Sequence, residues 1–249
     1  MTDQFEEEIL YGINPLHEAL HSGKVEIEKI FISKGGAEGK VGALMRMARQ
    51  RGIPVSNVPV GMLRRMSGTD KHQGIVATIA ASRYSSRQEI FQFIDDRSIV
   101  LILDGIEDPG NFGAIVRTAV ATSVAGIFIP IKRSVGMTKV AAKRSAGSIV
   151  HARISREKSL VSLAEALKEK GFHIVAVEKD GKEDFYDFLF EFPLALILGS
   201  ESSGITTELM SRTDASIRIP ISEQAESLNV SVACGVILYE VMRRSITKK

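Results

Sequence analysis

Residues 219–233 read Ile-Pro-Ile-Ser-Glu-Gln-Ala-Glu-Ser-Leu-Asn-Val-Ser-Val-Ala, and this stretch connects two buried elements. Residues 215–220 have the composition of a strand end, and the apolar spacing of residues 230–242 predicts a buried helix. Ser227 and Asn229 stand just before that helix, where their side chains can accept hydrogen bonds from its free N–H groups. A polar turn between a buried strand and a buried helix is a common ligand position in α/β proteins. The turn therefore indicates either a ligand site or a well-capped helix without further function.

From residue 98 onward, apolar strand-like runs alternate with helical patterns. Expected strands cover residues 99–103, 126–129, 173–177, 194–198 and 215–219, and expected helices cover 114–122, 139–145, 160–170 and 230–243. Such alternation predicts an α/β domain with a mostly parallel sheet that is covered by helices on both faces.

The first part of the chain has shorter elements and predicts a separate, small α/β domain. Expected helices cover residues 14–21, 41–50 and 61–66, and expected strands cover 27–33, 53–56 and 74–80. The polar stretch Ser82-Arg83-Tyr84-Ser85-Ser86-Arg87 then has the composition of a flexible connection. We therefore expect one domain at residues 1–82, a linker at 83–97 and a second domain at 98–249.

Composition excludes several classes of protein. Of the 249 residues, 44% are hydrophobic and 25% are charged, as in ordinary globular proteins, and no apolar run approaches the ~20 residues of a membrane span. The single cysteine, Cys234, excludes an internal disulfide, and its place in an apolar helix indicates a buried thiol rather than a nucleophile. Only His17 and His21 have helical metal-ligand spacing, and they lack further ligands, so we expect no metal. We expect the cytoplasm as the compartment.

The net charge of +2 is too small to indicate nucleic-acid binding by itself, but the basic residues are clustered. Such local patches fit a partner with phosphates, or else they are ordinary solvated helix faces. The clusters are Arg46, Arg49 and Arg51; Arg64, Arg65 and Lys71; and Lys132, Arg133, Lys139, Lys143 and Arg144.

Two further polar loops follow expected strands. Asp-Pro-Gly-Asn at 108–111 is strong turn chemistry, and Asn111 suits the cap of the next helix. Arg117 lies six residues later among apolar residues, where it either extends outward or faces an anion in a polar cleft. The strand at 194–198 runs into Gly199 and Glu201, which places a carboxylate at the carboxyl edge of the sheet. Neither the dinucleotide-binding nor the nucleoside-triphosphate glycine motif is present.

Together, the three loops resemble the three motifs of the SpoU (TrmH-type) RNA 2′-O-ribose methyltransferases of the SPOUT class, over roughly residues 98 to 245. The matching positions are Asn111, Gly113 and Arg117 in the first motif, Gly199 and Glu201 in the second, and Ile219, Pro220, Ser227, Leu228, Asn229 and Ser231 in the third.

The N-terminal part carries a second resemblance. Residues 11–20 and 72–77 are similar to the substrate-binding domain of some family members, a small fold of the type found in RNA-binding ribosomal proteins. This arrangement resembles that of bacterial enzymes that methylate a guanosine ribose of 23S ribosomal RNA, whereas members that act on transfer RNA usually lack the domain.

The resemblance implies a C-terminal domain tied into a trefoil knot, S-adenosyl-L-methionine held by the knotted loops, and a homodimer formed through the same domain. It implies no metal and no covalent intermediate. The cofactor would lie against Leu198, Gly199, Ile219, Pro220 and Leu228. The RNA would meet Arg64, Arg65, Lys71, Arg133, Lys143 and Arg144.

The catalytic residues implied by the resemblance are Asn111, Arg117, Glu201, Ser227 and Asn229. Family accounts make Arg117 the acceptor of the hydroxyl proton. Because guanidinium stays protonated in proteins, Arg117 could instead bind the neighbouring phosphate and stabilise a developing alkoxide. Asn111 would orient Arg117 or the ribose, and the other three would hold the constellation.

One position departs from the family pattern. Glu223 stands where members commonly have glycine, which would allow close backbone approach to the cofactor. We expect Glu223 to point to solvent, and the alternative is that its bulk and negative charge weaken cofactor binding. The alternatives to a 23S ribosomal RNA enzyme are a transfer-RNA methyltransferase, a ribosomal RNA enzyme that confers antibiotic resistance, and a non-catalytic RNA-binding or ribosome-assembly protein that has kept the fold.

Overall fold

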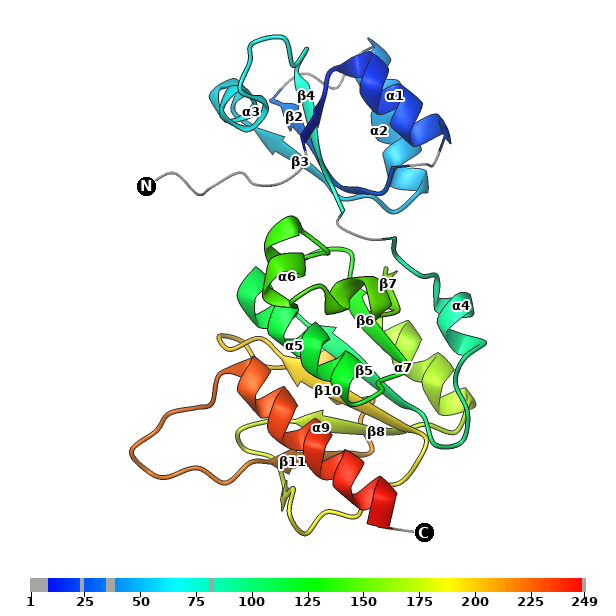
Figure 1. The fold of residues 1–249 in the computed structure, drawn as a ribbon, viewed down its shortest axis with the longest axis vertical. Coiled ribbons are helices and arrows are strands. Elements are labelled where there is room, and N and C mark those ends of the chain that lie inside the picture. The colour runs from blue at the N-terminus through cyan, green and yellow to red at the C-terminus, as the bar shows by residue number, and fades with distance from the viewer. Residues whose placement is uncertain (1–8, 23–24, 35–38, 81–82, 248–249) are drawn as a thin grey trace. The chain divides into compact units, whose positions relative to one another are not determined.

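The computed structural model describes residues 9–22, 25–34, 39–80 and 83–247 of the chain (Figure 1). The chain forms two compact units. The first comprises Met1–Arg83 with Gly136–Lys143, and the second comprises Tyr84–Val135 with Arg144–Lys249.

The first unit is built on a mixed four-stranded sheet with the strand order β1-β4-β2-β3. β1 and β2 are antiparallel to β4, and β3 is parallel to β2. The strands are β1 (Ile9–Tyr11), β2 (Ile27–Ser33), β3 (Val55–Val58) and β4 (Ile75–Ile79), and the helices are α1 (Ile13–Ser22), α2 (Gly39–Gln50) and α3 (Val60–Ser67).

Alternation along β2 explains how this sheet is covered. Ile30 and Ile32 pack with the buried faces of α1 and α2, whereas Phe31, which lies between them, packs with Leu63 and Met66 of α3. Successive side chains of a strand point to opposite faces, so α1 and α2 cover one face and α3 covers the other. All three expected helices and all three expected strands of this region are present, and the short β1 is an additional strand.

The second unit contains a seven-stranded sheet with the order β7-β6-β5-β10-β8-β11-β9, in which every neighbouring pair is parallel. The predicted α/β class with a mostly parallel sheet is therefore confirmed. The strands are β5 (Ile99–Asp104), β6 (Gly126–Pro130), β7 (Ile154–Glu157), β8 (His173–Val177), β9 (Glu183–Asp184), β10 (Leu194–Gly199) and β11 (Ala215–Arg218).

Helices cover both faces of this sheet. Ile90 of α4, Leu163 of α7 and Leu209 of α8 pack with strand residues such as Val100 and Ile197 in one core. α5 and α9 lie on the opposite face and pack against each other, where Gly235 of α9 brings the helices close at Thr118 of α5 (Figure 1). The bounds are α4 (Arg87–Phe91), α5 (Pro109–Ala121), α7 (Leu160–Glu169), α8 (Thr207–Met210) and α9 (Val230–Thr247), with a 3₁₀ turn at Ser148–His151. Helix α6 (Lys139–Arg144) belongs, up to Lys143, to the segment that groups with the first unit.

The segment expected as a linker, residues 83–97, is packed on the second unit from residue 84 onward. The Ser85 backbone N–H donates to the Ile154 carbonyl at 2.8 Å, which continues the pairing at strand β7. The Arg87 side chain binds the buried Glu157 carboxylate, with Nε 3.0 Å from Oε2. Ile90 is fully buried over Gly126, where a Cβ atom would lie 2.4 Å from the Ile90 side chain. This segment is therefore held in place by specific contacts.

Helix α5 begins earlier than expected and with a different cap. The Asp108 carboxylate accepts from the Asn111 N–H at 2.7 Å, and Pro109 occupies the first helical turn. Proline fixes the backbone angle that a helix start needs, and Asp is among the preferred capping residues. The expectation that Asn111 caps this helix is therefore wrong. Asn111 lies inside the first turn, and its side chain is free for other contacts.

Within the described parts of the chain, no helix is long and apolar enough to cross a membrane, and no group of three or more His, Cys, Asp or Glu side chains could hold a metal ion. Cys234 is buried in α9, and burial raises the pKa of its thiol to about 12. This placement is the one expected for a structural thiol.

The end of α9 carries an ion-pair cluster that predicts how stability depends on pH. Arg243 and Arg244 both donate to Glu240, with Nε–Oε distances of 2.8 and 2.6 Å. These hydrogen bonds lower the pKa of Glu240 from 4.5 to about 2. The stabilisation by Glu240 is complete above its unfolded-state pKa and disappears as the pH falls from about 4.5 to 2.

We therefore expect Glu240→Gln to lower the free energy of unfolding at pH 7 and to have a shrinking effect between pH 4.5 and 2. Urea unfolding at several pH values measures the free energy of unfolding of the wild type and of Glu240→Gln. Glu169→Gln is the control, because Glu169 is exposed and has no ion pair among the described residues. An effect of Glu240→Gln that stayed constant down to pH 2 would contradict the assignment.

Candidate active site

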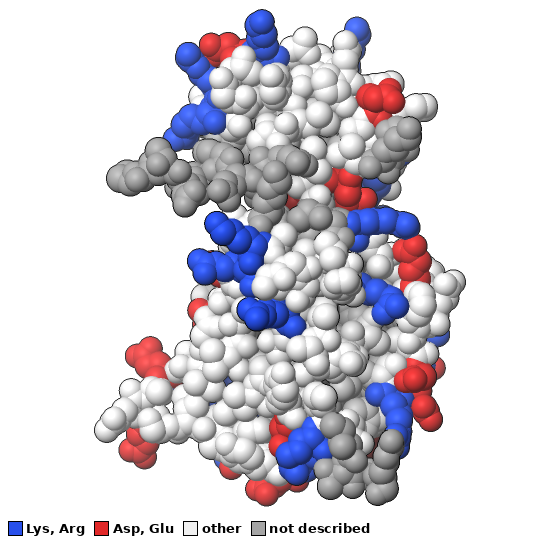
Figure 2. Space-filling view, in the orientation of Figure 1, with Lys and Arg blue, Asp and Glu red and all other residues white. Residues whose placement is uncertain are grey.

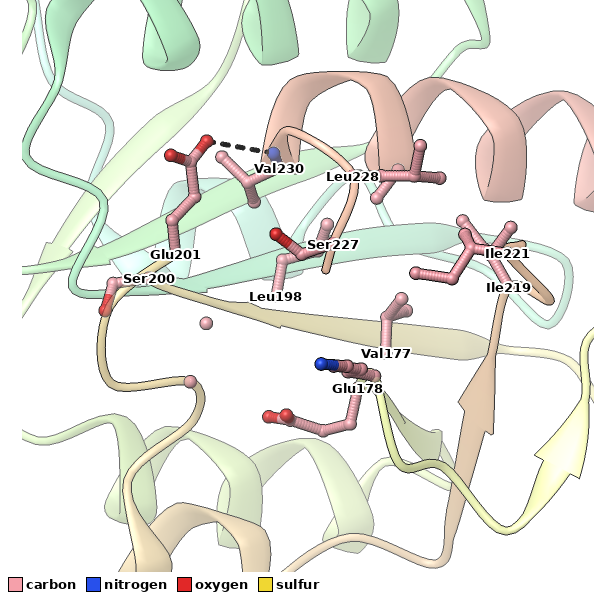
Figure 3. Close-up of a pocket in the computed structure, with 14 residues that line it drawn as sticks. Val177, Glu178, Leu198, Ser200, Glu201, Ile219, Ile221, Ser227, Leu228 and Val230 are labelled. Atoms are coloured by element: carbon pink, nitrogen blue, oxygen red, sulfur yellow. Dashed lines mark hydrogen bonds between the residues drawn. The ribbon is translucent and has the colours of Figure 1, made fainter. Parts of the chain in front are cut away.

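The three polar loops meet at the carboxyl ends of the central strands, and the Glu201 carboxylate joins them. Glu201 Oε1 accepts from Asn111 Nδ2 at 3.1 Å, from Asn229 Nδ2 at 2.8 Å and from the Val230 backbone N–H at 3.2 Å. Asn229 Nδ2 also lies 2.9 Å from Asn111 Oδ1. Figure 3 shows the bond from Val230 at the start of α9 to Glu201. We refer to Asn111, Glu201 and Asn229 as the amide–carboxylate cluster.

Two local features fix the position of this cluster. After β10 the chain closes a tight loop, in which Ser200 and Gly204 exchange backbone hydrogen bonds of 3.2 and 2.9 Å. A Cβ atom on Gly199 would lie 2.1 Å from the Gly204 carbonyl carbon, so only glycine allows this closure. At the other side, Asn229 caps α9, because its Oδ1 accepts from the Ser231 N–H at 2.9 Å. The expected capping role of Asn229 is therefore present.

A cavity of about 250 Å³ lies beside the cluster. Of the residues expected at a cofactor, Leu198, Gly199, Ile219 and Leu228 line this cavity, and Pro220 does not. Ser227 and Glu201 also line it (Figure 3). Sequence reasoning missed the remaining lining residues. Three of them, Val177, Glu178 and Lys179, lie at the end of β8, which no motif marks.

A second cavity of about 290 Å³ adjoins the first, since Ser200, Glu201 and Val230 line both. Its other lining residues include Asn111 and Arg133. The amide–carboxylate cluster therefore stands at the boundary of two cavities. One has mainly apolar walls, and the other has polar walls with one exposed guanidinium.

Glu178 is a half-buried carboxylate of the first cavity. Its Oε1 accepts from the Ile205 backbone N–H at 3.0 Å. Burial, and to a smaller extent the nearby Asp180, raise the pKa of Glu178, while the bond from Ile205 acts in the opposite direction. Glu223, by contrast, is exposed on the loop between β11 and α9, as its departure from the family pattern led us to expect.

Arg117 is not part of this cluster within one chain. It is exposed on α5, six residues beyond Asn111, which is about 9 Å along the helix axis. Neither cavity includes it, and among the described residues no hydrogen bond or ion pair engages its guanidinium. The structure therefore brings together four of the five expected catalytic residues, counting Ser227 in the cavity wall, and leaves Arg117 outside.

The residues expected to bind RNA are all exposed, and they lie on both units. Arg64 and Arg65 belong to α3, Lys71 follows in the next turn, and Lys143 and Arg144 end α6. Arg64 Nε lies 3.2 Å from Asp70 Oδ1, but an ion pair this exposed adds little stability and leaves the cation accessible. On the face shown in Figure 2, basic side chains gather over α5, and acidic ones occupy the loop before α9.

Comparison with known proteins identifies two matching families. Residues 98–239 match the SpoU rRNA Methylase family, and residues 9–85 match the RNA 2′-O ribose methyltransferase substrate-binding family. A Bacillus subtilis protein assigned to the TrmH family of tRNA/rRNA methyltransferases is 35% identical over 236 residues, covering 94% of each chain. A relative with the same assignment from Staphylococcus haemolyticus is 36% identical over 242 residues, covering 96% of each chain.

Solved structures agree with this result at the level of the fold. The SpoU methyltransferase AviRb of Streptomyces viridochromogenes, in complex with AdoMet, is 21% identical with a TM-score of 0.63, covering 98% of this chain and 92% of that one. An rRNA methyltransferase of Sinorhizobium meliloti is 24% identical with a TM-score of 0.61, covering 95% and 87%. With the two family matches and relatives above 30% identity over nearly its whole length, the chain belongs to the SpoU rRNA Methylase family and is an RNA methyltransferase.

Proposed function

We propose that the protein transfers a methyl group from S-adenosyl-L-methionine to the 2′-hydroxyl of a guanosine in 23S ribosomal RNA. The observation that carries this proposal is the amide–carboxylate cluster, which joins all three family motifs at the boundary of two adjacent cavities. A cofactor on one side and a ribose on the other would meet at this boundary.

The residues of the first cavity fit the proposed cofactor. Leu198, Ile219 and Leu228 give apolar walls that suit an adenine ring, and Glu201 adds a carboxylate that suits a ligand with a positive charge. When bound, S-adenosylmethionine supplies a sulfonium methyl group that is already activated for transfer. The protein then has to align the ribose oxygen with that methyl group and favour the charge that develops on the oxygen.

The amide–carboxylate cluster is suited to this alignment. Both asparagine amides are held by Glu201, and Asn111 also lines the second cavity, so the position of each amide group is fixed beside the reacting atoms. We assign them the orientation of the ribose, and Ser227 a contact at the cofactor side. Arg117 keeps its proton, so we assign it the phosphate next to the target ribose and the developing alkoxide rather than proton removal.

Because Arg117 lies outside the cavities of its own chain, we propose that a second copy supplies it in a homodimer. α9 presents an exposed apolar stripe with Val232 at 51%, Val236 at 36% and Tyr239 at 56% exposure. These three positions have helical spacing, so they lie on one face of α9. The same helix packs against α5, where Gly235 of α9 lies next to Thr118. This apolar stripe, on a helix that packs against the helix carrying Arg117, is the surface that such a dimer would bury.

The choice of RNA rests on the substrate-binding match and the basic residues. Residues 9–85 match a domain of RNA 2′-O ribose methyltransferases, and α3 of this unit exposes Arg64 and Arg65. We place the target in large-subunit ribosomal RNA and the protein in the cytoplasm. A transfer RNA is the second candidate, since the curated relatives are assigned to tRNA/rRNA methylation.

Removing the α3 cations is expected to weaken RNA binding by a salt-dependent amount. For Arg64→Ala/Arg65→Ala, we expect the slope of log affinity against log salt to become shallower by up to about 2. Filter binding of ribosomal RNA at 50–200 mM salt measures this slope. Arg46→Ala/Arg49→Ala is the matched control, because these residues are exposed on α2, which covers the opposite face of the sheet. Equal losses in both double variants would argue against α3 as the RNA surface.

Calorimetry of S-adenosylmethionine binding, combined with labelled-methyl transfer to unmodified 23S ribosomal RNA and to transfer RNA, tests the whole proposal. We expect cofactor binding, transfer to the 23S RNA, and a 2′-O-methylguanosine on digestion. Methyl transfer to transfer RNA but not to 23S RNA would show that transfer RNA is the substrate and that the 23S assignment is wrong. Absence of cofactor binding at millimolar concentration would overturn the proposed reaction and favour a non-catalytic RNA-binding role.

A further inference from the structure

The end of strand β8 contributes Glu178 to the first cavity, and no family motif includes this residue. Glu178 comes directly after β8, a neighbour of the central strand β10. Besides Glu178, the charged residues that line the cavity are Glu201 and Lys179, and the other lining residues are apolar or small and polar. A carboxylate at this position is therefore a chemical feature that a ligand has to match.

The two carboxylates of the cavity, Glu201 and Glu178, differ in the number of hydrogen bonds that the protein donates to them. Glu201 Oε1 receives three donors from the protein, which fixes it as part of the amide–carboxylate cluster. Glu178 receives one, from Ile205 to Oε1, and its Oε2 has no hydrogen-bond partner among the described residues. A carboxylate can accept about four hydrogen bonds. A half-buried carboxylate whose acceptor sites are not all used loses free energy of solvation without full compensation. Glu178 therefore has acceptor capacity that a ligand in the cavity can use.

The position of Glu178 in the cavity indicates which part of a ligand it would meet. Figure 3 shows Glu178 across the cavity from Leu198 and Ser227. To one side lies the loop that carries Glu201, and to the other lie Ile219 and Ile221. The reacting methyl group has to lie near Glu201, and an adenine suits the apolar side chains, so the group that joins them lies between. In an adenosyl cofactor, that group is the ribose.

We propose that Glu178 accepts hydrogen bonds from the vicinal diol of the cofactor ribose, and so selects an intact ribonucleoside. A diol supplies two O–H donors, which match the free acceptor capacity of this carboxylate. An acidic side chain that follows a strand of a parallel sheet plays the same part toward ribose in dinucleotide-binding proteins. The inference rests on the proposed use of S-adenosylmethionine and adds to it the residue that recognises the sugar.

Calorimetry with three ligands tests this assignment on the full-length protein. The ligands are S-adenosylhomocysteine, 5′-methylthioadenosine, which lacks the amino-acid part, and 2′,3′-dideoxy-5′-methylthioadenosine, which lacks the diol. For Glu178→Gln we expect both diol-containing ligands to lose affinity by the same factor, about tenfold or more, because a charge-assisted acceptor is lost. The dideoxy ligand should bind the wild type and the variant equally.

The glutamine side chain in Glu178→Gln retains an oxygen that can accept from the Ile205 N–H, so the fold should persist, and the melting temperature checks this. Asp180→Asn is the matched control, since it removes the same charge two residues away but Asp180 does not line the cavity. A loss for S-adenosylhomocysteine but not for 5′-methylthioadenosine would assign Glu178 to the cofactor ammonium group and overturn the proposal. Unchanged affinity for all ligands would make Glu178 purely structural. If the wild type binds none of them, the proposed cofactor itself fails, which is a different result.

Discussion

An Arg117→Ala variant is expected to lose turnover by about 10²- to 10³-fold, the usual effect of removing a group that stabilises charge on a reacting oxygen. The affinity for S-adenosylmethionine should stay within about twofold of the wild type, because Arg117 lines neither cavity. The stability should also change little, since the side chain is exposed. Single-turnover methyl transfer and calorimetry on the same preparation separate the two effects.

The proposed dimer makes a sharper test possible. If Arg117 acts on the partner's amide–carboxylate cluster, a mixture of Arg117→Ala and Asn229→Ala subunits contains mixed dimers with one intact site. After unfolding and refolding together, such a mixture should regain about one quarter of the wild-type activity, because about half of the dimers are mixed. Each variant refolded alone serves as the control. Failure to regain any activity, with mixed dimers demonstrated by mass, would place Arg117 in the site of its own chain.

A Gly199→Ala variant is expected to lose both stability and cofactor binding. The added Cβ would lie 2.1 Å from the Gly204 carbonyl carbon and 2.4 Å from the Ile205 nitrogen. Both are backbone atoms, so no side chain can rotate to make room, and the loop that carries Glu201 has to open. We expect a loss of about 3 kcal/mol or more in the free energy of unfolding and at least a tenfold loss in cofactor affinity.

Urea unfolding and calorimetry measure these two quantities. Gly61→Ala is the control, because Gly61 lies in α3 with nothing within 4 Å of an added Cβ. That substitution should raise stability by about 0.5–1 kcal/mol, since alanine favours a helix. A Gly199→Ala protein that bound the cofactor as tightly as the wild type would show that the tight loop is not needed for the cavity.

The sequence predicted the elements of the fold well where hydrophobic periodicity is strong. The expected strands at 99–103 and 173–177 differ from β5 and β8 by at most one residue, because both are apolar runs in the buried middle of the sheet. It missed β7 and β9, which lie at or near the sheet edges, where short and polar sequences also form strands. The expectation of a knot and the proposal of a dimer came from the family resemblance, since periodicity carries no information on chain threading or on a second copy.

Only those residues of the candidate site that belong to a sequence motif could be predicted. Glu201 and Asn229 could be placed from their positions after a strand and before a helix, and both lie in the cluster. The cap of α5 was assigned to Asn111 instead of Asp108, because both residue types are good caps and only the backbone decides between them. Glu178 gave no signal, since a lone glutamate after a strand looks like an ordinary solvated residue until the cavity is seen.

The burial of Cys234 has a practical consequence for studying this protein. With a thiol pKa of about 12 and almost no exposed surface, the native cysteine should be inert to maleimides under folding conditions. A cysteine introduced at an exposed position outside the apolar stripe of α9, such as Glu208 of α8, would then be the one reactive thiol in the described chain. Fluorophores attached there would report the association of two chains by energy transfer, without first removing the native thiol.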